Sequence, residues 1–269
     1  MTVLADKLAK AKADGRAALI GYLPVGFPNV ELSIEAIVAL VEGGADVVEV
    51  GVPYSDPVMD GPVIQAAADV AVRRGTGLGD ALQAVAAVAD AGGAAVVMSY
   101  WNPIEHYGVE RFAADLAAAN GSGAITPDLI PDEAMPWMTA TDEHGLDRVF
   151  LVAPSSTDAR IASTVAACRG FVYAASTMGV TGTRDQVSDA AQQLVQRVRR
   201  TAPDFPVCVG LGVSNGAQAA QVANFADGVI VGTAFVSRLL DQPNTSGVAT
   251  VRELAGELAD GVRQRSAVG

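Results

Sequence analysis

The sequence predicts an α/β protein: a single domain, residues 1–269, whose parallel strands close into a (β/α)8 TIM barrel. Eight short apolar runs rich in β-branched residues alternate with segments of helical periodicity. Each run is apolar along nearly its whole length, as is typical of parallel strands covered by helices. Eight strands close a barrel, and 269 residues is an ordinary length for one. A doubly wound open sheet is the alternative, because a strand count from pattern alone can be wrong by one or two.

The expected strands are short and lead into segments that contain Gly, Pro, Ser or Asp, the residues typical of the following loops. In chain order they are Ala17–Leu23, Asp46–Val52, Ala94–Tyr100, Gly123–Thr126, Arg148–Ala153, Phe171–Ser176, Pro206–Gly212 and Gly228–Gly232.

The expected helices have apolar residues at helical spacing, and several are followed directly by a glycine that can end a helix. Between the strands they are Glu31–Glu42, Leu78–Ala91, Val109–Ala119, Pro131–Glu143, Asp158–Cys168, Gln186–Arg200 and Asn215–Asn224. Three further amphipathic segments extend the basic barrel. They are an N-terminal helix, an inserted helix after the second strand and a closing helix: Val3–Ala13, Val63–Arg74 and Val248–Val262.

The composition of the chain argues against several classes of protein, among them nucleic-acid-binding, membrane-spanning and secreted proteins. A formal net charge of −12, without clusters of Lys or Arg, argues against partners such as nucleic acid or an anionic membrane. No apolar run approaches the length of a membrane span, and no secretory pattern opens the chain. The two cysteines, Cys168 and Cys208, follow no metal or redox spacing and are typical of a reducing cytoplasm. We therefore expect a cytoplasmic protein.

The second predicted strand carries an acid that is hard to explain as packing. Glu49 lies inside an apolar run, where an ionised side chain is costly unless a function requires it. Asp56 and Asp60 follow in a segment whose prolines and glycines exclude a helix. Asp56 is best explained as a turn residue. For Asp60, a role in the turn and a role in the function are about equally compatible with the sequence. A buried acid at a strand end, facing an acidic loop, can hold two acid–base groups around a substrate.

Three glycine-containing loops follow the last three predicted strands, at 179–183, 210–214 and 232–233. Glycine lets the backbone approach an anion, and the N–H groups of a following helix favour negative charge. Barrels often bind phosphate after strands seven and eight. Each loop alone is a weak signal, but the three together indicate a phosphate site.

Other side chains narrow the chemistry further. No lysine lies within the predicted strands, which argues against a Schiff-base aldolase mechanism. His106 and His144 are expected in a loop and at a helix end, without a spaced catalytic partner. Aromatic residues at strand ends can form the walls around a flat aromatic substrate: Tyr22, Tyr100, Trp101 and Tyr173.

With these motifs in order, the chain resembles the α subunit of tryptophan synthase over essentially its whole length. The specific match is Glu49-x-Gly-x-Pro-Tyr-Ser-Asp56-Pro-x-x-Asp60-Gly-Pro-x-Ile64-Gln. It is followed by Asn102-Pro-Ile, Pro127-Asp128-Leu, Gly179-Val-Thr-Gly182, Gly210-x-Gly212-Val-Ser and Gly232-Thr233. Compared with the family, Tyr22 replaces a common Phe, Met59 a smaller residue and Thr233 a common Ser.

The resemblance implies a carbon–carbon lyase of tryptophan biosynthesis that cleaves indole-3-glycerol phosphate to indole and glyceraldehyde 3-phosphate by a retro-aldol reaction, without cofactor or metal. It makes Glu49 the acid–base group and Asp60 the partner of the indole nitrogen. The substrate-binding residues implied are Tyr22, Ile64 and Tyr100 around indole, Tyr173 beside the substrate, Thr181 in a mobile loop, and Gly182, Gly212, Gly232 and Thr233 at the phosphate. It also implies a β-chain partner in an α2β2 heterotetramer.

Two alternatives remain from the sequence. One keeps the barrel and the phosphate site but makes the protein a stand-alone indole-releasing lyase or a sugar-phosphate isomerase. The other is a barrel that regulates a partner and has lost its own chemistry. The intact pair of Glu49 and Asp60 argues against a binding-only barrel, because a buried acid is costly to keep.

Overall fold

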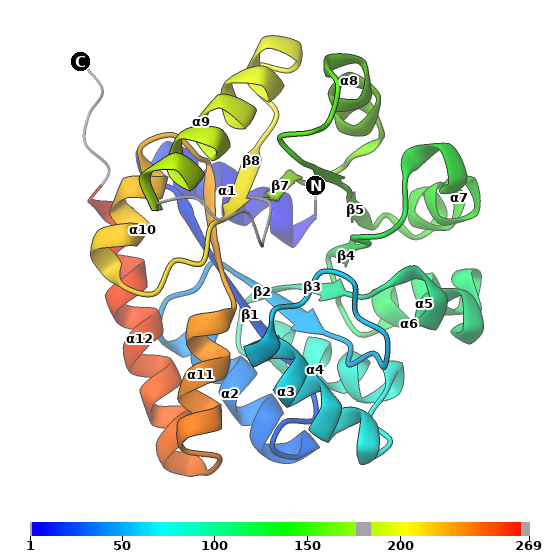
Figure 1. The fold of residues 1–269 in the computed structure, drawn as a ribbon. Coiled ribbons are helices and arrows are strands. Elements are labelled where there is room, and N and C mark those ends of the chain that lie inside the picture. Colours follow the sequence, from blue (N-terminus) through cyan, green and yellow to red (C-terminus); the bar gives the residue numbers. More distant parts are fainter. Residues whose placement is uncertain (1, 176–183, 265–269) are drawn as a thin grey trace.

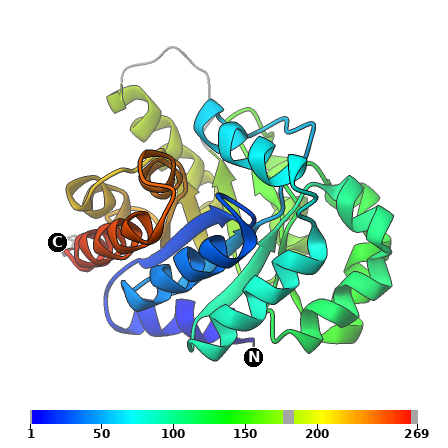
Figure 2. The same cartoon turned by 90° about the horizontal axis from the view of Figure 1, so that it is seen from below.

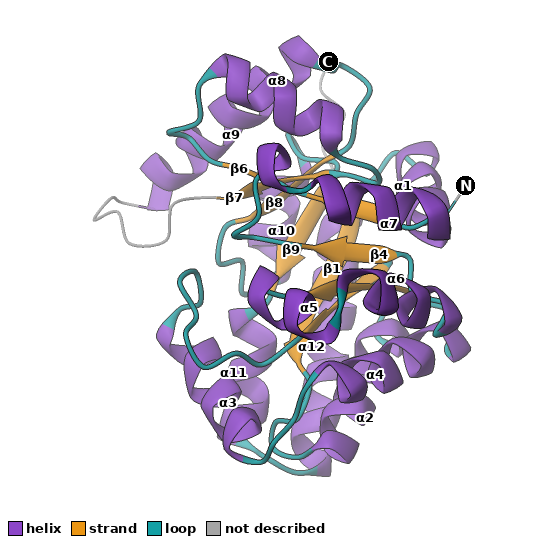
Figure 3. Cartoon of the chain, turned by 90° about the vertical axis from the view of Figure 1, so that its right-hand side faces the viewer, coloured by secondary structure: helices purple, strands orange, loops and turns teal. Residues whose placement is uncertain are grey.

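The computed structural model describes residues 2–175 and 184–264, and it closes the predicted parallel sheet into a barrel. Within these residues nine parallel strands lie in the order β5-β4-β3-β2-β1-β9-β8-β7-β6. Because the two outermost strands of this order, β5 and β6, follow each other directly in the chain, the sheet closes on itself. Helices surround the strands (Figures 1 and 3). The barrel is therefore confirmed, and the open sheet is excluded.

All eight predicted strands are present, with ends within two residues of the expected ones where the structure describes them. The strands are β1 (Ala18–Pro24), β2 (Val47–Gly51), β3 (Ala94–Met98), β4 (Gly123–Ile125), β5 (Asp147–Val149), β6 (Leu151–Val152), β7 (Val172–Ala175), β8 (Val207–Gly210) and β9 (Gly228–Val231).

The helices alternate with the strands. They are α1 (Val3–Ala13), α2 (Val30–Glu42), α3 (Pro62–Arg73), α4 (Leu78–Asp90), α5 (Trp101–Tyr107), α6 (Val109–Ala118), α7 (Met135–His144, after a 3-10 turn at Pro131–Glu133), α8 (Asp158–Ala167), α9 (Arg184–Thr201), α10 (Gly216–Ala223), α11 (Thr233–Asp241) and α12 (Thr245–Arg263).

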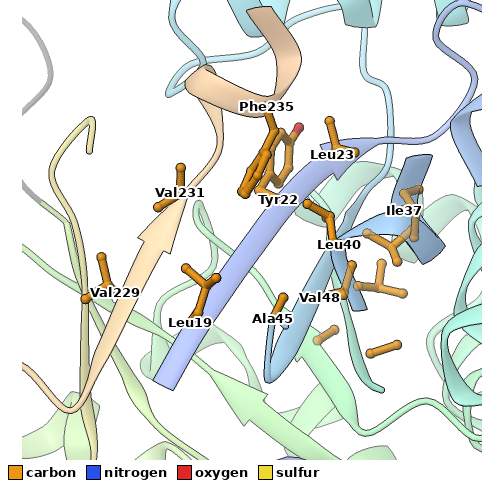
Figure 4. Close-up of a cluster of buried hydrophobic side chains, with 14 of the residues drawn as sticks. Leu19, Tyr22, Leu23, Ile37, Leu40, Ala45, Val48, Val229, Val231 and Phe235 are labelled. Atoms are coloured by element: carbon orange, nitrogen blue, oxygen red, sulfur yellow. The ribbon is translucent and has the colours of Figure 1, made fainter. Parts of the chain in front are cut away.

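The strands pack through two separate apolar layers, because successive side chains of a strand point to opposite faces. On β1, Leu19 and Leu23 face outward and belong to the cluster that also contains Ile37 and Leu40 of α2 (Figure 4). Ile20 points inward and joins the core inside the barrel. The inward side of each strand therefore fills the barrel at one end and builds a site at the other.

Helix α1 closes the amino-terminal end of the barrel, as Figure 2 allows the reader to follow. Leu4, Leu8 and Ala11 are buried against the inward-facing residues of the strands. The Thr2 hydroxyl caps the helix by accepting the N–H of Ala5, and it also donates to the carboxylate of Asp147 at the start of β5. With this end plugged, a substrate can enter only from the carboxyl end.

The structure differs from the sequence prediction in three places. The predicted fifth strand is divided at Phe150, where the run changes partner from β4 to β7, giving β5 and β6. Helices α5 and α11 were not predicted, and the loop assigned to His106 was wrong, because this exposed residue lies near the end of α5. His144 ends α7 as expected, with its ring nitrogen 2.8 Å from the Glu110 carboxylate.

Candidate active site

Glu49 lies near the carboxyl end of β2, opposite Tyr22 of β1 and Val96 of β3. It points into the barrel like Val47, two residues earlier, because the side-chain period of a strand is two. The side chain is 2 % exposed, and among the described residues no group donates a hydrogen bond to its Oε1. Burial raises the pKa of Glu49 to about 8. At neutral pH this carboxyl group therefore holds a proton and can act as an acid.

Asp60 reaches the same space from the acidic loop, residues 52–61, which joins β2 to α3. Its carbonyl oxygen accepts a hydrogen bond of 2.8 Å from the side chain of Gln65 in the first turn of α3. Burial raises the pKa of Asp60 to about 6. Asp56, in contrast, is exposed and accepts a hydrogen bond from the Ser55 hydroxyl. The loop thus directs one of its two carboxylates into the barrel.

Both acids line one cavity of about 120 Å³, similar in size to a cavity that accepts a benzene ring (about 150 Å³). Its other walls are mainly apolar or aromatic. The lining residues are Tyr22, Glu49, Met59, Asp60, Ile64, Met98, Leu151, Tyr173, Ala175, Gly210, Gly212, Ile230, Gly232 and Thr233.

Two tyrosines stand beside the acids, each against a glycine of a neighbouring strand. A Cβ atom at Gly51 would lie 2.5 Å from the Tyr22 hydroxyl oxygen, and one at Gly210 2.6 Å from that of Tyr173. Glycine at these positions gives both rings the space to lie in the barrel mouth. Burial, with the nearby charges of Asp60 and Glu49, raises the pKa of Tyr22 well above its usual value. Burial and Glu49 do the same for Tyr173. Both hydroxyls are therefore neutral.

The helices after the last two strands differ at their N-termini. Backbone N–H groups in the first turn of α10 already have acceptors within the protein. The side chain of Asn215 caps the helix, and the Glu257 carboxylate accepts the N–H of Gly216. Helix α11 follows Gly232, and no side chain of the described residues caps it. Gly232 and Thr233 at its start line the cavity. The N-terminus of α11 therefore presents backbone amides and the positive end of the helix dipole to a ligand.

Most of the predicted site residues meet at this cavity: Glu49, Asp60, Tyr22, Ile64, Tyr173, Gly212, Gly232 and Thr233. Tyr100 is not among the lining residues, although it is buried close by. Thr181 and Gly182 lie outside the described residues. Gly210, from the predicted glycine loop 210–214, lines the cavity too, and so do residues that the sequence did not single out: Met98, Leu151, Ala175 and Ile230. The signal that could have found them is their position at the carboxyl ends of the strands.

Among the described residues, no three His, Cys, Asp or Glu side chains are grouped so that they could hold a metal ion. The cavity combines a proton donor, a second carboxylate, a ring-sized apolar space and an anion-binding helix end. Such an arrangement can protonate a flat aromatic substrate, balance positive charge on it and hold a phosphate group at a distance from the ring.

Comparison with known proteins agrees with this chemistry. Residues 8–263 match the family model described as tryptophan synthase alpha chain. The chain is 66% identical over 266 residues to the tryptophan synthase alpha chain of Thermobifida fusca, covering 98% of each protein. It is 58% identical over 269 residues to that of Acidothermus cellulolyticus, covering 100% of each.

Solved structures give the same result. A structure of Mycobacterium tuberculosis tryptophan synthase superposes with a TM-score of 0.90 at 58% identity, covering 97% of this chain and 98% of that one. The tryptophan synthase subunit alpha of Legionella pneumophila gives a TM-score of 0.88 at 30% identity, covering 97% and 98%. On the family match and these identities along nearly the full length, the chain belongs to the tryptophan synthase alpha chain family.

Proposed function

We propose that Glu49 and Asp60 are the groups with which this lyase cleaves indole-3-glycerol phosphate to indole and glyceraldehyde 3-phosphate, the reaction of its family. The observation that carries this assignment is that both acids line one cavity, Glu49 buried and Asp60 half-buried, with burial raising their pKa values to about 8 and about 6. Two acids with separated pKa values can take different protonation states at the same pH.

In the proposed mechanism the protonated carboxyl group of Glu49 gives its proton to C3 of the indole ring. This makes the bond from C3 to the glycerol chain labile and leaves positive charge on the ring nitrogen. The ionised Asp60 accepts the indole N–H and stabilises that charge. The Glu49 carboxylate then takes the proton of the glycerol hydroxyl as the carbon–carbon bond breaks. The bond electrons return to the ring, and Glu49 ends protonated, as it began.

The apolar walls of the cavity support the placement of the ring. Ile64 of α3 comes from the inserted helix, and Met98, Leu151 and Ile230 come from strand ends. Tyr22 and Tyr173 complete the aromatic side of the site. Met59, which is 37 % exposed, covers part of the entrance. The phosphate is assigned to Gly212, Gly232 and Thr233, with Gly182 as a further contact that the resemblance implies, while Thr181 is assigned by the same resemblance to the loop over the substrate.

The phosphate assignment predicts a selective effect of Thr233→Glu. Thr233 is the first residue of α11, where a carboxylate interacts favourably with the helix dipole, so the helix is preserved. The same carboxylate repels the substrate phosphate and competes for its amides. We expect KM for indole-3-glycerol phosphate to rise about tenfold or more, corresponding to about 1.4 kcal/mol. Steady-state kinetics measures this, with Thr233→Gln as the uncharged control. Equal KM values for the two variants would contradict the assignment of the substrate phosphate to this helix end.

We also propose that the chain works with a tryptophan synthase beta chain in an α2β2 heterotetramer in the cytoplasm, and that residues 1–269 form one domain. Relatives solved as tryptophan synthase support the partner. A single apolar cluster with members from Ala17 to Val262 supports one domain. The free, buried Cys168 and Cys208 fit a reducing compartment. In the described part of the chain, no helix has the length and apolar composition needed to cross a membrane.

The decisive experiment supplies indole-3-glycerol phosphate to the purified chain, with and without a cognate beta chain, and follows indole. We expect indole release in both cases, much faster with the beta chain present. Equal turnover without it would favour a stand-alone lyase. No indole in either case would contradict the proposed reaction and leave the regulatory barrel as the better description.

A further inference from the structure

Tyr100 is buried beside the active-site cavity and contacts the loop that carries Asp60. It follows β3, immediately precedes α5 and is 5% exposed. Its hydroxyl oxygen accepts a hydrogen bond of 3.0 Å from the backbone N–H of Met59. Met59 and Asp60 line the cavity, whereas Tyr100 does not. The ring therefore lies behind the acidic loop rather than in the cavity lining.

One amide of the loop, the N–H of Met59, donates a hydrogen bond to this hydroxyl. Burial raises the pKa of Tyr100, and the backbone N–H groups of Met59, Val58 and Asp60 act in the opposite direction by favouring the ionised oxygen. Met59, whose N–H makes this hydrogen bond, immediately precedes Asp60 in the chain. Tyr100 therefore acts on the backbone from which the Asp60 side chain projects.

The acidic loop needs such an anchor because it forms no helix or strand between Asp56 and Asp60. Val58 is 77% exposed and contributes little burial to hold the segment in place. On the far side of Asp60, the Gln65 side chain holds the carbonyl oxygen. The hydroxyl of Tyr100 holds the near side. Together the two contacts bracket the residue.

Tyr100 is itself held firmly. Its ring packs against that of Tyr54, with the ring centroids 5.3 Å apart. The Tyr54 hydroxyl accepts a hydrogen bond of 3.3 Å from the side chain of Asn102. The N–H of Trp101, the next residue in the chain, donates to the Asp128 carboxylate at 2.9 Å. A rigid anchor of this kind can fix a loop to the barrel wall.

We propose that Tyr100 is a positioning residue, whose hydroxyl fixes the backbone of residues 58–60 so that the Asp60 carboxylate reaches the substrate ring. This assignment rests on the proposed role of Asp60. It gives Tyr100 a different task from a contact with indole. The ring of Tyr100 supplies packing, and the hydroxyl supplies the position of the acid.

The test is Tyr100→Phe, which removes the hydroxyl and keeps the ring packing with Tyr54. Loss of one hydrogen bond at a catalytic loop is expected to lower kcat about fivefold to tenfold. KM should change less, because the phosphate and ring contacts remain. The matched control is Tyr107→Phe, at the other end of α5, which removes a hydroxyl that donates to the Asp115 carboxylate at 2.6 Å and contacts neither the acidic loop nor the cavity lining. This control should keep the original kcat.

A second readout follows the titration of Asp60 directly, by NMR of protein labelled with ¹³C in the aspartate carboxyl groups. Asp60→Asn identifies the signal. The groups that face Asp60 are Glu49, Tyr22, Tyr100 and Tyr173. Release of the loop in Tyr100→Phe exposes the carboxylate, so its midpoint should fall from about 6 toward the ordinary 3.8. Tyr107→Phe should leave the midpoint in place.

An Asp60 midpoint that is unchanged in Tyr100→Phe overturns the proposal, whatever happens to kcat. A midpoint that falls, together with a lower kcat, supports it. The titration needs no substrate. It therefore separates this proposal from the proposed function, which fails instead if Asp60→Asn retains the turnover of the unaltered enzyme.

Discussion

Glu49→Gln is expected to lower kcat for indole release by about three orders of magnitude, within the range attributed to a lost acid–base group. The amide has the shape of the carboxylic acid but can neither give its proton to C3 nor take one from the glycerol hydroxyl. Substrate still binds, because the apolar walls and the helix end remain. Single-turnover indole release and equilibrium binding of the substrate measure the two effects separately.

The control is Glu253→Gln, the same change at an exposed position of α12. It should keep full turnover. Substantial activity in Glu49→Gln would show that the proton comes from another group. Loss of binding together with turnover would instead show that Glu49 holds the substrate.

The same variant has a predictable stability. The pKa of Glu49 is raised in the folded chain, from 4.5 to about 8, so the native state binds more protons than the unfolded state between these values. The contribution of Glu49 to the free energy of unfolding is therefore complete at low pH and is lost as pH rises toward about 8, where the buried carboxylate ionises. Gln does not ionise, so the variant does not lose stability in this way. The free energy of unfolding of Glu49→Gln, relative to the unaltered chain, should rise across this pH window, so a loss of activity cannot be attributed to unfolding.

The sequence predicted the strands well because each is apolar along nearly its whole length, and several are followed closely by a glycine or proline. Two helices were missed for identifiable reasons. In α5, Pro103 stands in the first turn, where proline is compatible with a helix, but the segment reads as the end of a strand and a loop. In α11, Gly232 and Thr233 read as a glycine loop, which concealed the helix that begins at Thr233.

A site residue could be predicted from the sequence where its side chain departs from the pattern of the residues around it. Glu49 was such an anomaly, an acid in an apolar strand. Tyr100 was not, since an aromatic residue at a strand end is equally compatible with pocket lining and with packing. Its position behind the acidic loop depends on how β2 and β3 lie side by side, and no local pattern contains that information. The division of Asp56 from Asp60 likewise required the path of the loop.

Asp60→Asn is the second change with a large expected effect, a fall in kcat/KM of about a hundredfold. The amide retains the shape and can still accept the indole N–H, but it has no charge to stabilise the positive nitrogen that forms when C3 is protonated. Removing one preorganised electrostatic partner of a transition state typically costs about 10²–10³ in rate. The matched control is Asp56→Asn in the same loop, whose carboxylate is exposed and lies away from the cavity lining.

The pH profile distinguishes this role from simple packing. Cleavage needs Asp60 ionised and Glu49 protonated. The rate kcat/KM should therefore rise with pH through about 6, and fall again through about 8. In Asp60→Asn the residual activity should lose the acidic limb and keep the basic one. The substrate phosphate also titrates near pH 6, and its limb would persist in the variant. An acidic limb that is unchanged in Asp60→Asn therefore assigns that proton to the substrate and contradicts the charge-stabilising role of Asp60.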